Sequence, residues 1–299
     1  MKVAVIGASG QLGMDVSGEF DRAGAEIVRL DHGEIEISSL EDTREELGKI
    51  RPECVVNTAA MHHVENCERQ PERAYAVNAI GAKNLATATN ELNAILMHIS
   101  TDYVFDGKKG EPYVETDPPL PLNVYGNTKM AGESFIRAAA KKYFILRTSA
   151  LYGIHPCRAK GGRNFVELML KLAAERDELR VVADERVSPT STAELAKQIV
   201  QLSRTDAFGL YHATAEGSCS WYEFAEKIFE TTGTKISLKV AAADEFPAKV
   251  PRPKYSVLEN HNLKKLGLNF FQSWEDGLRS YLQTTQRIGQ SKASATSCD

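Results

Sequence analysis

Short apolar runs and longer amphipathic stretches alternate through the first half of the chain. The runs are rich in Val, Ile and Leu, which is typical of strands buried on both faces of a sheet. Strands are therefore predicted at 2–6, 26–30, 53–57, 95–99 and 143–148. The stretches between them predict helices at 11–23, 39–49, 71–92 and 124–140. This alternation predicts a doubly wound parallel α/β sheet of the Rossmann type.

The pattern becomes less regular after residue 152. A basic, glycine-containing loop at 155–163 is predicted to be mobile and to lie near the mouth of a substrate cleft. Ser220 is expected to cap one of the later helices. These helices are predicted at 165–176, 192–203 and 221–232, with strands at 180–182 and 209–213.

Two domains and a tail are predicted from these elements. A dinucleotide-binding Rossmann domain covers 1–152 and is joined by about 186–213. A smaller α/β lobe, made of 153–185 and 214–284, is expected to bind the substrate. Residues 285–299 are expected to be a disordered tail, because small polar side chains dominate its end.

The composition favours a soluble enzyme of the cytoplasm. A net charge of -4 and a pI near 6.0 give no electrostatic reason to expect a nucleic-acid partner. No apolar run approaches a membrane span, and the first residues enter a strand directly, so neither a membrane partner nor a signal peptide is expected. The five cysteines are scattered and form no CxxC pair, which favours reduced thiols over disulfide bonds or zinc ligands.

A glycine-rich loop follows the first predicted strand and opens the first predicted helix. Gly7 permits the tight turn, Gly10 lets the backbone approach a pyrophosphate, and Gly13 lets the helix pack on the sheet. The helix start, with Gln11 and Leu12, turns unpaired N–H groups toward the phosphates. We therefore predict that residues 7–13 bind a dinucleotide cofactor.

Asp31 stands at the end of the second predicted strand. An acid at this distance from the glycine loop is expected to hold the ribose hydroxyls of the cofactor, which favours NADH over NADPH. Arg29 lies nearby and weakens that preference. The alternative is that Asp31 only begins a turn.

Tyr125 and Lys129 stand one helical turn apart on one helix face. A lysine charge near the phenol favours the phenolate, although bringing the tyrosine pKa near 7 requires about 4 kcal/mol of selective stabilisation. Such a tyrosine is a proton donor that works at neutral pH, as carbonyl reduction requires.

The loop, the acid and the Tyr/Lys pair together resemble the extended short-chain dehydrogenase/reductase superfamily. Longer motifs resemble one branch of it, the dTDP-4-dehydrorhamnose reductases, over residues 1 to about 284. The most specific are HISTDYVFDG at 98–107, ETD at 115–117 and PLNVYGNTKMAGE at 121–133. Further similarity lies at 51–60, 146–149, 162–165, 188–190, 209–212 and 252–253. The resemblance implies reduction of the C4 keto group of dTDP-4-dehydro-L-rhamnose by NADH or NADPH, with NADH slightly favoured.

The resemblance also implies a catalytic trio. The hydroxyl of Thr101, at a strand end, would bond the substrate oxygen. Tyr125 would donate the proton to that oxygen as hydride arrives. Lys129 would hold the nicotinamide ribose and lower the tyrosine pKa.

Other contacts are implied by the same resemblance. Ala59 and Ala60 would let the cofactor pass close to the backbone. Asn78 would be either a cofactor contact or a helix-packing amide. The residues expected at the nucleotide-sugar substrate are Tyr103, Asn164 and Arg252, with Arg252 matched to phosphate oxygens.

The chain departs from the family pattern at two places. Met61-His62-His63 follows the paired alanines, and one histidine is expected either to enter the substrate pocket or to be a polar loop residue. Some family members bind magnesium across a dimer, and the matching positions here are Asp15, Glu194 and Gln283. Two acids and an amide suit a hard cation poorly, so no metal is expected, and Asp15 and Glu194 are predicted to be surface charges. Monomer and homodimer both remain open.

Three alternative functions are weighed against this prediction. A nucleotide-sugar 4,6-dehydratase is disfavoured, because Tyr103 stands where such an enzyme needs a glutamate. A non-catalytic regulatory subunit of the same fold is disfavoured by the intact trio. A reductase or epimerase of another nucleotide sugar remains an alternative.

Overall fold

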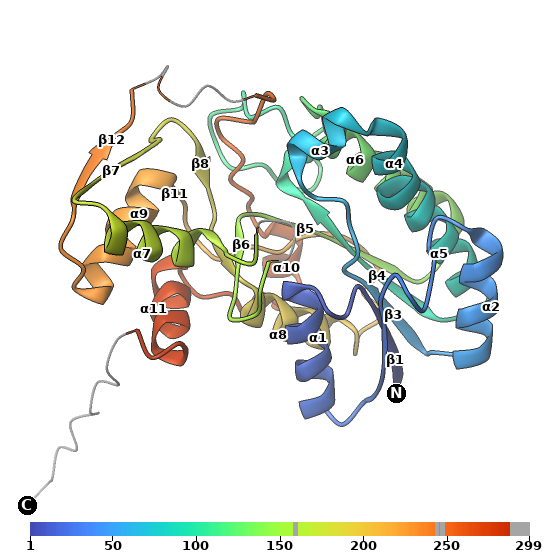
Figure 1. Ribbon diagram of the computed structural model, residues 1–299. Coiled ribbons are helices and arrows are strands. Elements are labelled where there is room, and N and C mark those ends of the chain that lie inside the picture. Colours follow the sequence, from blue (N-terminus) through green and yellow to red (C-terminus); the bar gives the residue numbers. More distant parts are fainter. Residues whose placement is uncertain (158–160, 243–244, 246–248, 288–299) are drawn as a thin grey trace, which may run out of the picture.

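A six-stranded parallel sheet forms the centre of the molecule in the computed structural model, which describes residues 1–157, 161–242, 245 and 249–287 (Figure 1). Its strand order is β10-β5-β4-β3-β1-β2. The strands are β1 (Lys2–Ile6), β2 (Glu26–Leu30), β3 (Cys54–Asn57), β4 (Ile95–Thr101), β5 (Tyr143–Thr148) and β10 (Gly209–His212). The order reverses between β1 and β3, as in doubly wound folds, so the prediction of a Rossmann-type sheet is confirmed.

Helices cover both faces of this sheet, and β1 shows why. Side chains alternate across a strand, so Val3 and Val5 join one buried cluster while Ala4 and Ile6 join another. The first cluster packs under α1 (Gln11–Arg22) and α8 (Thr192–Leu202). The second packs under α2 (Leu40–Ile50), α5 (Gly81–Glu91) and α6 (Val124–Ala139).

The helix predicted at 71–92 is not one regular helix. It consists of α4 (Pro71–Tyr75), a π-helical turn η1 (Ala76–Ile80) and α5, and it is preceded by α3 (Val64–Arg69), which was not predicted. The other predicted elements of the first half are present, with ends that differ by at most two residues. Short segments such as α3 lack the length over which a helical period can be recognised.

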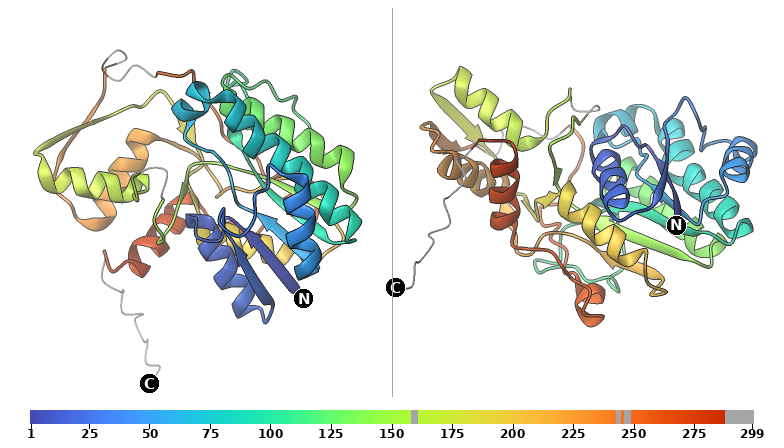
Figure 2. Two further views of the ribbon diagram at one scale, coloured as in Figure 1. Left: turned by 45° about the vertical axis from the view of Figure 1, so that its right-hand side comes forward. Right: turned by 90° about the horizontal axis from the view of Figure 1, so that it is seen from below.

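A third buried cluster lies beside the sheet, and both views in Figure 2 show its elements grouped to one side. Phe224 and Trp274 are at its centre. Ser220 caps α9 (Trp221–Thr232) in a capping box with Glu223, as predicted for the serine. The cluster also includes α7 (Phe165–Glu175), β7 (Glu178–Val181), β12 (Ser237–Val240) and α11 (Trp274–Thr284), of which β12 and α11 were not predicted.

Several connecting elements were also not predicted. They are β6 (Leu151–Tyr152), β8 (Arg186–Val187), β9 (Thr190–Ser191), β11 (Cys219–Ser220), η2 (Asp102–Val104) and α10 (His261–Lys265). Within the described part of the chain, every helix is too short or too polar to cross a bilayer.

The predicted tail starts too early. Residues 285–287 close the last turn of α11, because Arg287 N–H bonds the Leu282 carbonyl at 2.9 Å. The remainder, 288–299, lies outside the described residues, as does 158–160 in the loop that was predicted to be mobile. The division into two domains stays a prediction.

Candidate active site

The glycine loop is packed too tightly for side chains. A Cβ on Gly7, which has a φ of +75°, would lie 2.9 Å from the Ala59 nitrogen, and one on Gly13 would lie 2.2 Å from the Gly7 carbonyl oxygen. Gly10 caps α1 without any side-chain hydrogen bond, so the first N–H groups of the helix have no side-chain cap. This bare helix start fits a phosphate-bearing cofactor.

A cleft of about 390 Å³ opens beside this loop. It brings together five residues that were predicted to bind the cofactor, namely Gly7, Gly10, Asp31, Ala59 and Ala60. Ser9, His32, Glu36, Ser38, His62, Arg73 and Val77 also line it. The cleft lies at the carboxyl ends of β1, β2 and β3, which is where doubly wound sheets bind dinucleotides.

Asp31 lies next to the glycine loop. Its Oδ1 accepts the backbone N–H of Ser9 at 3.1 Å, which fixes the carboxylate at the cleft wall. Glu36 lies on the same wall, where hydrogen bonds from Ser38 hold the pKa of its carboxyl below the usual value. The two carboxylates favour hydroxyl groups over an added phosphate, whereas Arg73, which lines the same cleft, acts in the opposite sense.

Gln11 and Leu12 do not line the cleft. Gln11 donates from Nε2 to the His155 carbonyl at 2.9 Å and therefore ties α1 to the segment that follows β6. Leu12 is buried in the core cluster shared with α8. Their predicted part in cofactor binding stays a prediction, and only their backbone N–H groups at the helix start are free of these contacts.

Asn78 is a packing amide. It lies in η1 and is 1% exposed. Its Oδ1 accepts the Met61 N–H at 2.8 Å, and its Nδ2 donates to the Met61 carbonyl at 2.9 Å and to Thr128 Oγ1 at 3.0 Å. Both ends of the side chain are occupied, so the structure favours the scaffold alternative over a cofactor contact.

The catalytic trio converges where β4 ends and α6 begins. Thr101 is the last residue of β4, and Tyr125 is the second residue of α6. Asn123 caps α6 by accepting the Gly126 N–H at 2.9 Å, and a Cβ on Gly126 would lie 2.2 Å from the Tyr103 carbonyl. The helix start is therefore pressed against the segment that follows β4.

Burial favours the protonated form of Tyr125. Desolvation raises the pKa of the phenol above its usual value, the Thr101 hydroxyl opposes this by hydrogen bonding, and the Asp102 carboxylate adds to the rise. Lys129 is not among the groups that shift the pKa of this phenol in the structure, and its predicted effect on Tyr125 stays a prediction. Nζ of Lys129 lies 2.6 Å from the Ile99 carbonyl and 3.1 Å from Nε2 of His98.

Asp102 is a functional candidate that sequence reasoning overlooked. The carboxylate is 4% exposed and accepts hydroxyl hydrogen bonds from Thr101 (3.1 Å), Ser149 (2.9 Å) and Ser256 (2.6 Å). Burial raises its pKa to about 6. No ion pair to Asp102 is present in the described ranges, so hydroxyl groups and a backbone N–H compensate its charge. Its place inside the STDYVFDG motif, next to Thr101, was the available signal.

The residues expected at the substrate lie in different surroundings. Tyr103 packs edge-on against Tyr125, with ring centroids 5.9 Å apart. Arg252 is half-buried and donates to Oε1 of Glu65 at 2.8 Å, which joins α3 to the segment before α10. Glu65 also lies 3.2 Å from Nδ1 of His63. The Arg252 charge counteracts part of the rise that burial causes in the pKa of Tyr103.

The prediction that Asn164 contacts the substrate is not supported. Asn164 is 3% exposed and caps α7 by accepting the Glu167 N–H at 3.1 Å. Its Nδ2 donates to the Gly153 carbonyl at 2.8 Å and to the Tyr281 hydroxyl at 3.2 Å. Because all of its polar atoms are used, this asparagine orders the loop instead.

His62 and His63 separate in the structure. His62 lines the cleft, with Nε2 3.8 Å from the Cys157 sulfur, and His63 begins α3. Cys157 is half-buried, whereas Cys54, Cys67 and Cys219 are buried; all four are free thiols.

Asp15 and Glu194 are not surface charges, contrary to the prediction. Asp15 is 11% exposed, accepts the Thr192 hydroxyl and lies 3.4 Å from Nε2 of His155. Burial raises the pKa of both carboxyls: Asp15 of α1 lies against Thr192 of α8, and a Cβ on Gly277 of α11 would lie 2.9 Å from Oε2 of Glu194. In the part of the chain that the structure describes, no three His, Cys, Asp or Glu side chains are grouped to hold a metal ion.

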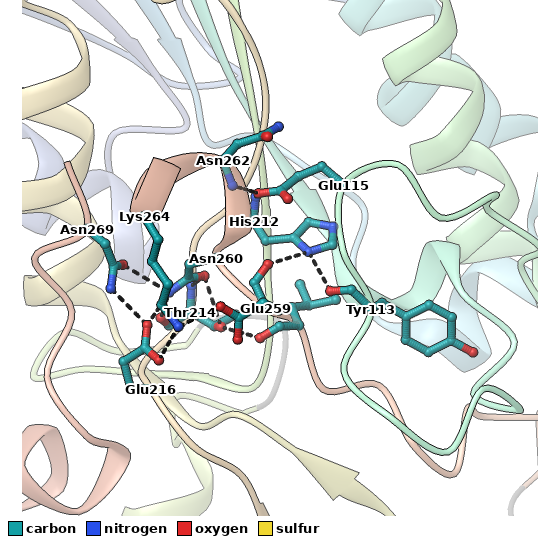
Figure 3. Close-up of polar contacts among 11 residues, drawn as sticks. Tyr113, Glu115, His212, Thr214, Glu216, Glu259, Asn260, Asn262, Lys264 and Asn269 are labelled. Carbon is teal, nitrogen blue, oxygen red and sulfur yellow. Dashed lines mark hydrogen bonds and ion pairs between the residues drawn. The ribbon is translucent and has the colours of Figure 1, made fainter. Parts of the chain in front are cut away.

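A polar network supports the segment that follows β4 (Figure 3). Glu115, from the ETD motif, accepts the backbone N–H groups of His212 at 2.9 Å and Asn262 at 3.1 Å. Burial lowers the pKa of His212 to about 3, so its neutral ring donates from Nδ1 toward the carbonyls of Tyr113 and Glu259, 3.0 and 3.1 Å away. The network continues through Thr214, Glu216, Asn260, Lys264 and Asn269. Glu115 and His212 are therefore structural residues.

Comparison with known proteins gives consistent matches over nearly the whole chain. The family model described as the RmlD substrate binding domain matches residues 1–287. The spore coat polysaccharide biosynthesis protein SpsK of Bacillus subtilis is 42% identical over 282 residues, covering 94% of this chain and 97% of that protein. A dTDP-4-dehydrorhamnose reductase of Streptomyces griseus is 38% identical, covering 92% and 90%.

A solved structure is similarly close. The dTDP-4-dehydrorhamnose reductase of Bacillus anthracis, in complex with NADP, superposes with a TM-score of 0.89 at 40% identity. The match covers 94% of this chain and 98% of that one.

Proposed function

The chain belongs to the family described as the RmlD substrate binding domain, and from that membership we propose that it is an NAD(P)H-dependent reductase of the C4 keto group of a dTDP-4-keto-6-deoxy sugar. The proposed substrate is dTDP-4-dehydro-L-rhamnose, and the product is dTDP-L-rhamnose. The observation that carries the proposal is the convergence of Thr101, Tyr125 and Lys129 where β4 ends and α6 begins, in the same sheet whose β1 leads into the glycine loop.

The chain's own residues divide the work of the reduction. A nicotinamide cofactor, when bound, supplies the hydride to the carbonyl carbon. Tyr125 gives its phenolic proton to the carbonyl oxygen as negative charge develops there. Thr101 orients the phenol through their hydrogen bond. Lys129 then supports the return of a proton to the tyrosine.

Substrate recognition is proposed on the side of Tyr125 that faces Tyr103 and Arg252. A guanidinium can bond a diphosphate through two parallel N–H groups, and Nε of Arg252 is buried without a hydrogen-bond partner among the described residues. Glu65 holds the same side chain from α3 and so keeps it in place before substrate arrives.

We further propose that the enzyme acts in the cytoplasm, where reduced nicotinamide cofactors are made, as a monomer or a homodimer. The proposed division of labour places the cofactor on 1–152 with 186–213 and the sugar on 153–185 with 214–284. No nucleic acid or membrane partner is proposed.

The test is oxidation of NADH and of NADPH with dTDP-4-dehydro-L-rhamnose, with and without a chelator. Rapid oxidation supports the reductase, and its cofactor ratio gives the preference. Parallel assays with the 4-epimeric and other nucleotide 4-keto sugars separate the proposed substrate from related ones. A chain that binds cofactor but reduces none of them would be a non-catalytic relative of the same fold.

A further inference from the structure

A chain of hydrogen bonds runs beneath the site from the cofactor cleft to Lys129. The backbone N–H of Ala59 donates to Oδ1 of Asn57 at 3.1 Å, and Nδ2 of Asn57 lies 3.0 Å from Nδ1 of His98. Nε2 of His98 lies 3.1 Å from Nζ of Lys129, which also donates to the Ile99 carbonyl at 2.6 Å. Asn57, His98 and Lys129 are each 1% exposed, so bulk water does not complete their hydrogen bonding.

The direction of this chain is fixed at its start. A backbone N–H can only donate, so the Asn57 atom that faces Ala59 is the oxygen and the atom that faces His98 is the NH₂ donor. Nδ1 of His98 must therefore accept. A neutral imidazole that accepts at Nδ1 carries its proton on Nε2, the atom that faces Lys129.

This donor meets a second potential donor at Lys129. An ammonium has three N–H groups and no lone pair, whereas an amine has one lone pair that can accept. The contact between Nε2 and Nζ is a hydrogen bond only when the lysine is an amine. Burial acts in the same sense, lowering the pKa of Lys129 to about 8 and that of His98 well below its usual value.

We propose that His98 is a positioning residue that acts through Lys129: by donating from Nε2 to Nζ, it favours the amine form of the lysine over the ammonium. A proton that arrives at Nζ takes up the lone pair and breaks the contact with His98. When that proton leaves for the Tyr125 phenolate or for solvent, the contact forms again and no other bond has changed. Lys129 is then a group that exchanges protons near neutral pH rather than a permanent cation.

Other charged groups near Lys129 act in the opposite sense or are already paired. Glu133, one turn along α6, favours the ammonium, but it is held by Arg147 of β5 at 2.7 Å and by Ser100 of β4 at 2.6 Å. Tyr125 shares α6 with the lysine and is protonated. His98 is the titratable neighbour on β4.

Nitrogen-15 NMR of the histidine rings in the complete, ligand-free chain tests the proposal directly, because it distinguishes the two neutral tautomers. We expect His98 to be neutral with its proton on Nε2. In Asn57→Asp the carboxylate accepts from both Ala59 and His98, so the ring proton is expected to move to Nδ1. A proton on Nδ1 in the parent chain, or a charged ring at neutral pH, overturns the proposal.

The pH profile of turnover supplies a second test, which rests on the proposed function. His98→Leu removes the N–H group that donates to Lys129. The part of the pH profile that is set by the pKa of Lys129 is therefore expected to shift to higher pH by about one unit. His98→Gln can still accept from Asn57 and donate to Lys129, and it is expected to restore this part of the profile toward its original position. A profile that stays in place in His98→Leu overturns the proposal.

Failure of the proposed function is distinguishable from failure of this inference. A parent chain without turnover on the keto sugar refutes the assigned reaction, while the tautomer of His98 still decides the role of the histidine. His261→Gln, at an exposed position of α10, is the control for replacing a histidine as such.

Discussion

Tyr125 and Asp102 lie side by side in the site, and desolvation raises the pKa of both groups. A phenol that keeps its proton until a carbonyl oxygen becomes negative is suited to reduction. Asp102, with a pKa of about 6, is mainly ionised at neutral pH and accepts a hydrogen bond from the Thr101 hydroxyl. That Thr101 bonds the substrate oxygen stays a prediction.

Replacement of Tyr125 by phenylalanine removes the proposed proton donor. Turnover is expected to fall by at least ~10²-fold, the usual scale for loss of a general acid, with cofactor affinity unchanged. Steady-state kinetics and cofactor titration measure the two quantities. Tyr143→Phe, at the start of β5, controls for loss of a phenolic hydroxyl elsewhere. Near-normal turnover in Tyr125→Phe excludes the assigned role.

Replacement of Asp31 tests the source of cofactor preference. Removing the carboxylate relieves repulsion of a ribose phosphate, so the ratio of NADPH to NADH affinity is expected to rise by about 5- to 10-fold. Asp31→Asn keeps an acceptor for the Ser9 N–H, whereas Asp31→Ala does not. A rise in both variants assigns the effect to charge, and a rise in Asp31→Ala alone assigns it to the loop.

A buried ion pair joins three elements beneath the site. Glu133 of α6 receives two hydrogen bonds from Arg147 of β5, at 2.9 and 2.7 Å, and one from Ser100 of β4 at 2.6 Å. Glu133 is 2% exposed and Arg147 is 1% exposed. The pair fixes α6, and with it Tyr125 and Lys129, against the ends of the strands.

Glu133→Met leaves the arginine charge buried without its partner. The free energy of unfolding is expected to fall by about 3–5 kcal/mol, measured by urea unfolding. Glu133→Met combined with Arg147→Met removes both charges and should regain much of that loss. Equal stability of the single variant and the parent chain contradicts the account.

The elements differed in how well their sequence predicted them. Strands such as β1 and β5 are continuous apolar runs, and the STDYVFDG and YGNTK motifs located Thr101, Tyr125 and Lys129. The π-helical turn at Ala76–Ile80 leaves no mark in the hydrophobic period, and α11 was overlooked. The motif match that suggested Asn164 as a substrate contact did not show that its side chain bonds the Gly153 carbonyl and the Glu167 N–H.

At the scale of the whole molecule, buried polar contacts join segments that are far apart in the chain. Asp102 bonds Ser256, and Arg252 bonds Glu65, across 154 and 187 positions. Such pairs carry no local pattern, so the sequence could not predict them. His212 belongs to the same class of contact, because it links the segment after β4 to β10 and α10.

His212 makes stability depend on pH. The pKa of His212 is about 3 in the folded chain, compared with an ordinary value of 6.5. Between pH 6.5 and about 3, the unfolded chain therefore binds more protons than the folded chain. The free energy of unfolding is expected to fall as the pH decreases through this window, by on the order of 4 kcal/mol from this ring.

Urea unfolding at several pH values between 7 and about 4 measures this dependence. His212→Asn keeps a donor toward the Tyr113 and Glu259 carbonyls but cannot titrate, so its slope is expected to be smaller. His261→Asn, on the surface, should retain the parent slope. Identical slopes in all three chains contradict the assignment.

The π-helical turn η1 makes one stretch of the chain intolerant of a change in length. Surface loops absorb single-residue insertions and deletions, but a π turn is an α-helix with one extra residue. Deleting one residue from Ala76–Ile80 would produce a more regular helix and rotate one side of it by about 100° relative to the other. Asn78 could not then hold both Met61 and Thr128, so a more helical chain would lose the alignment between the cleft wall and α6.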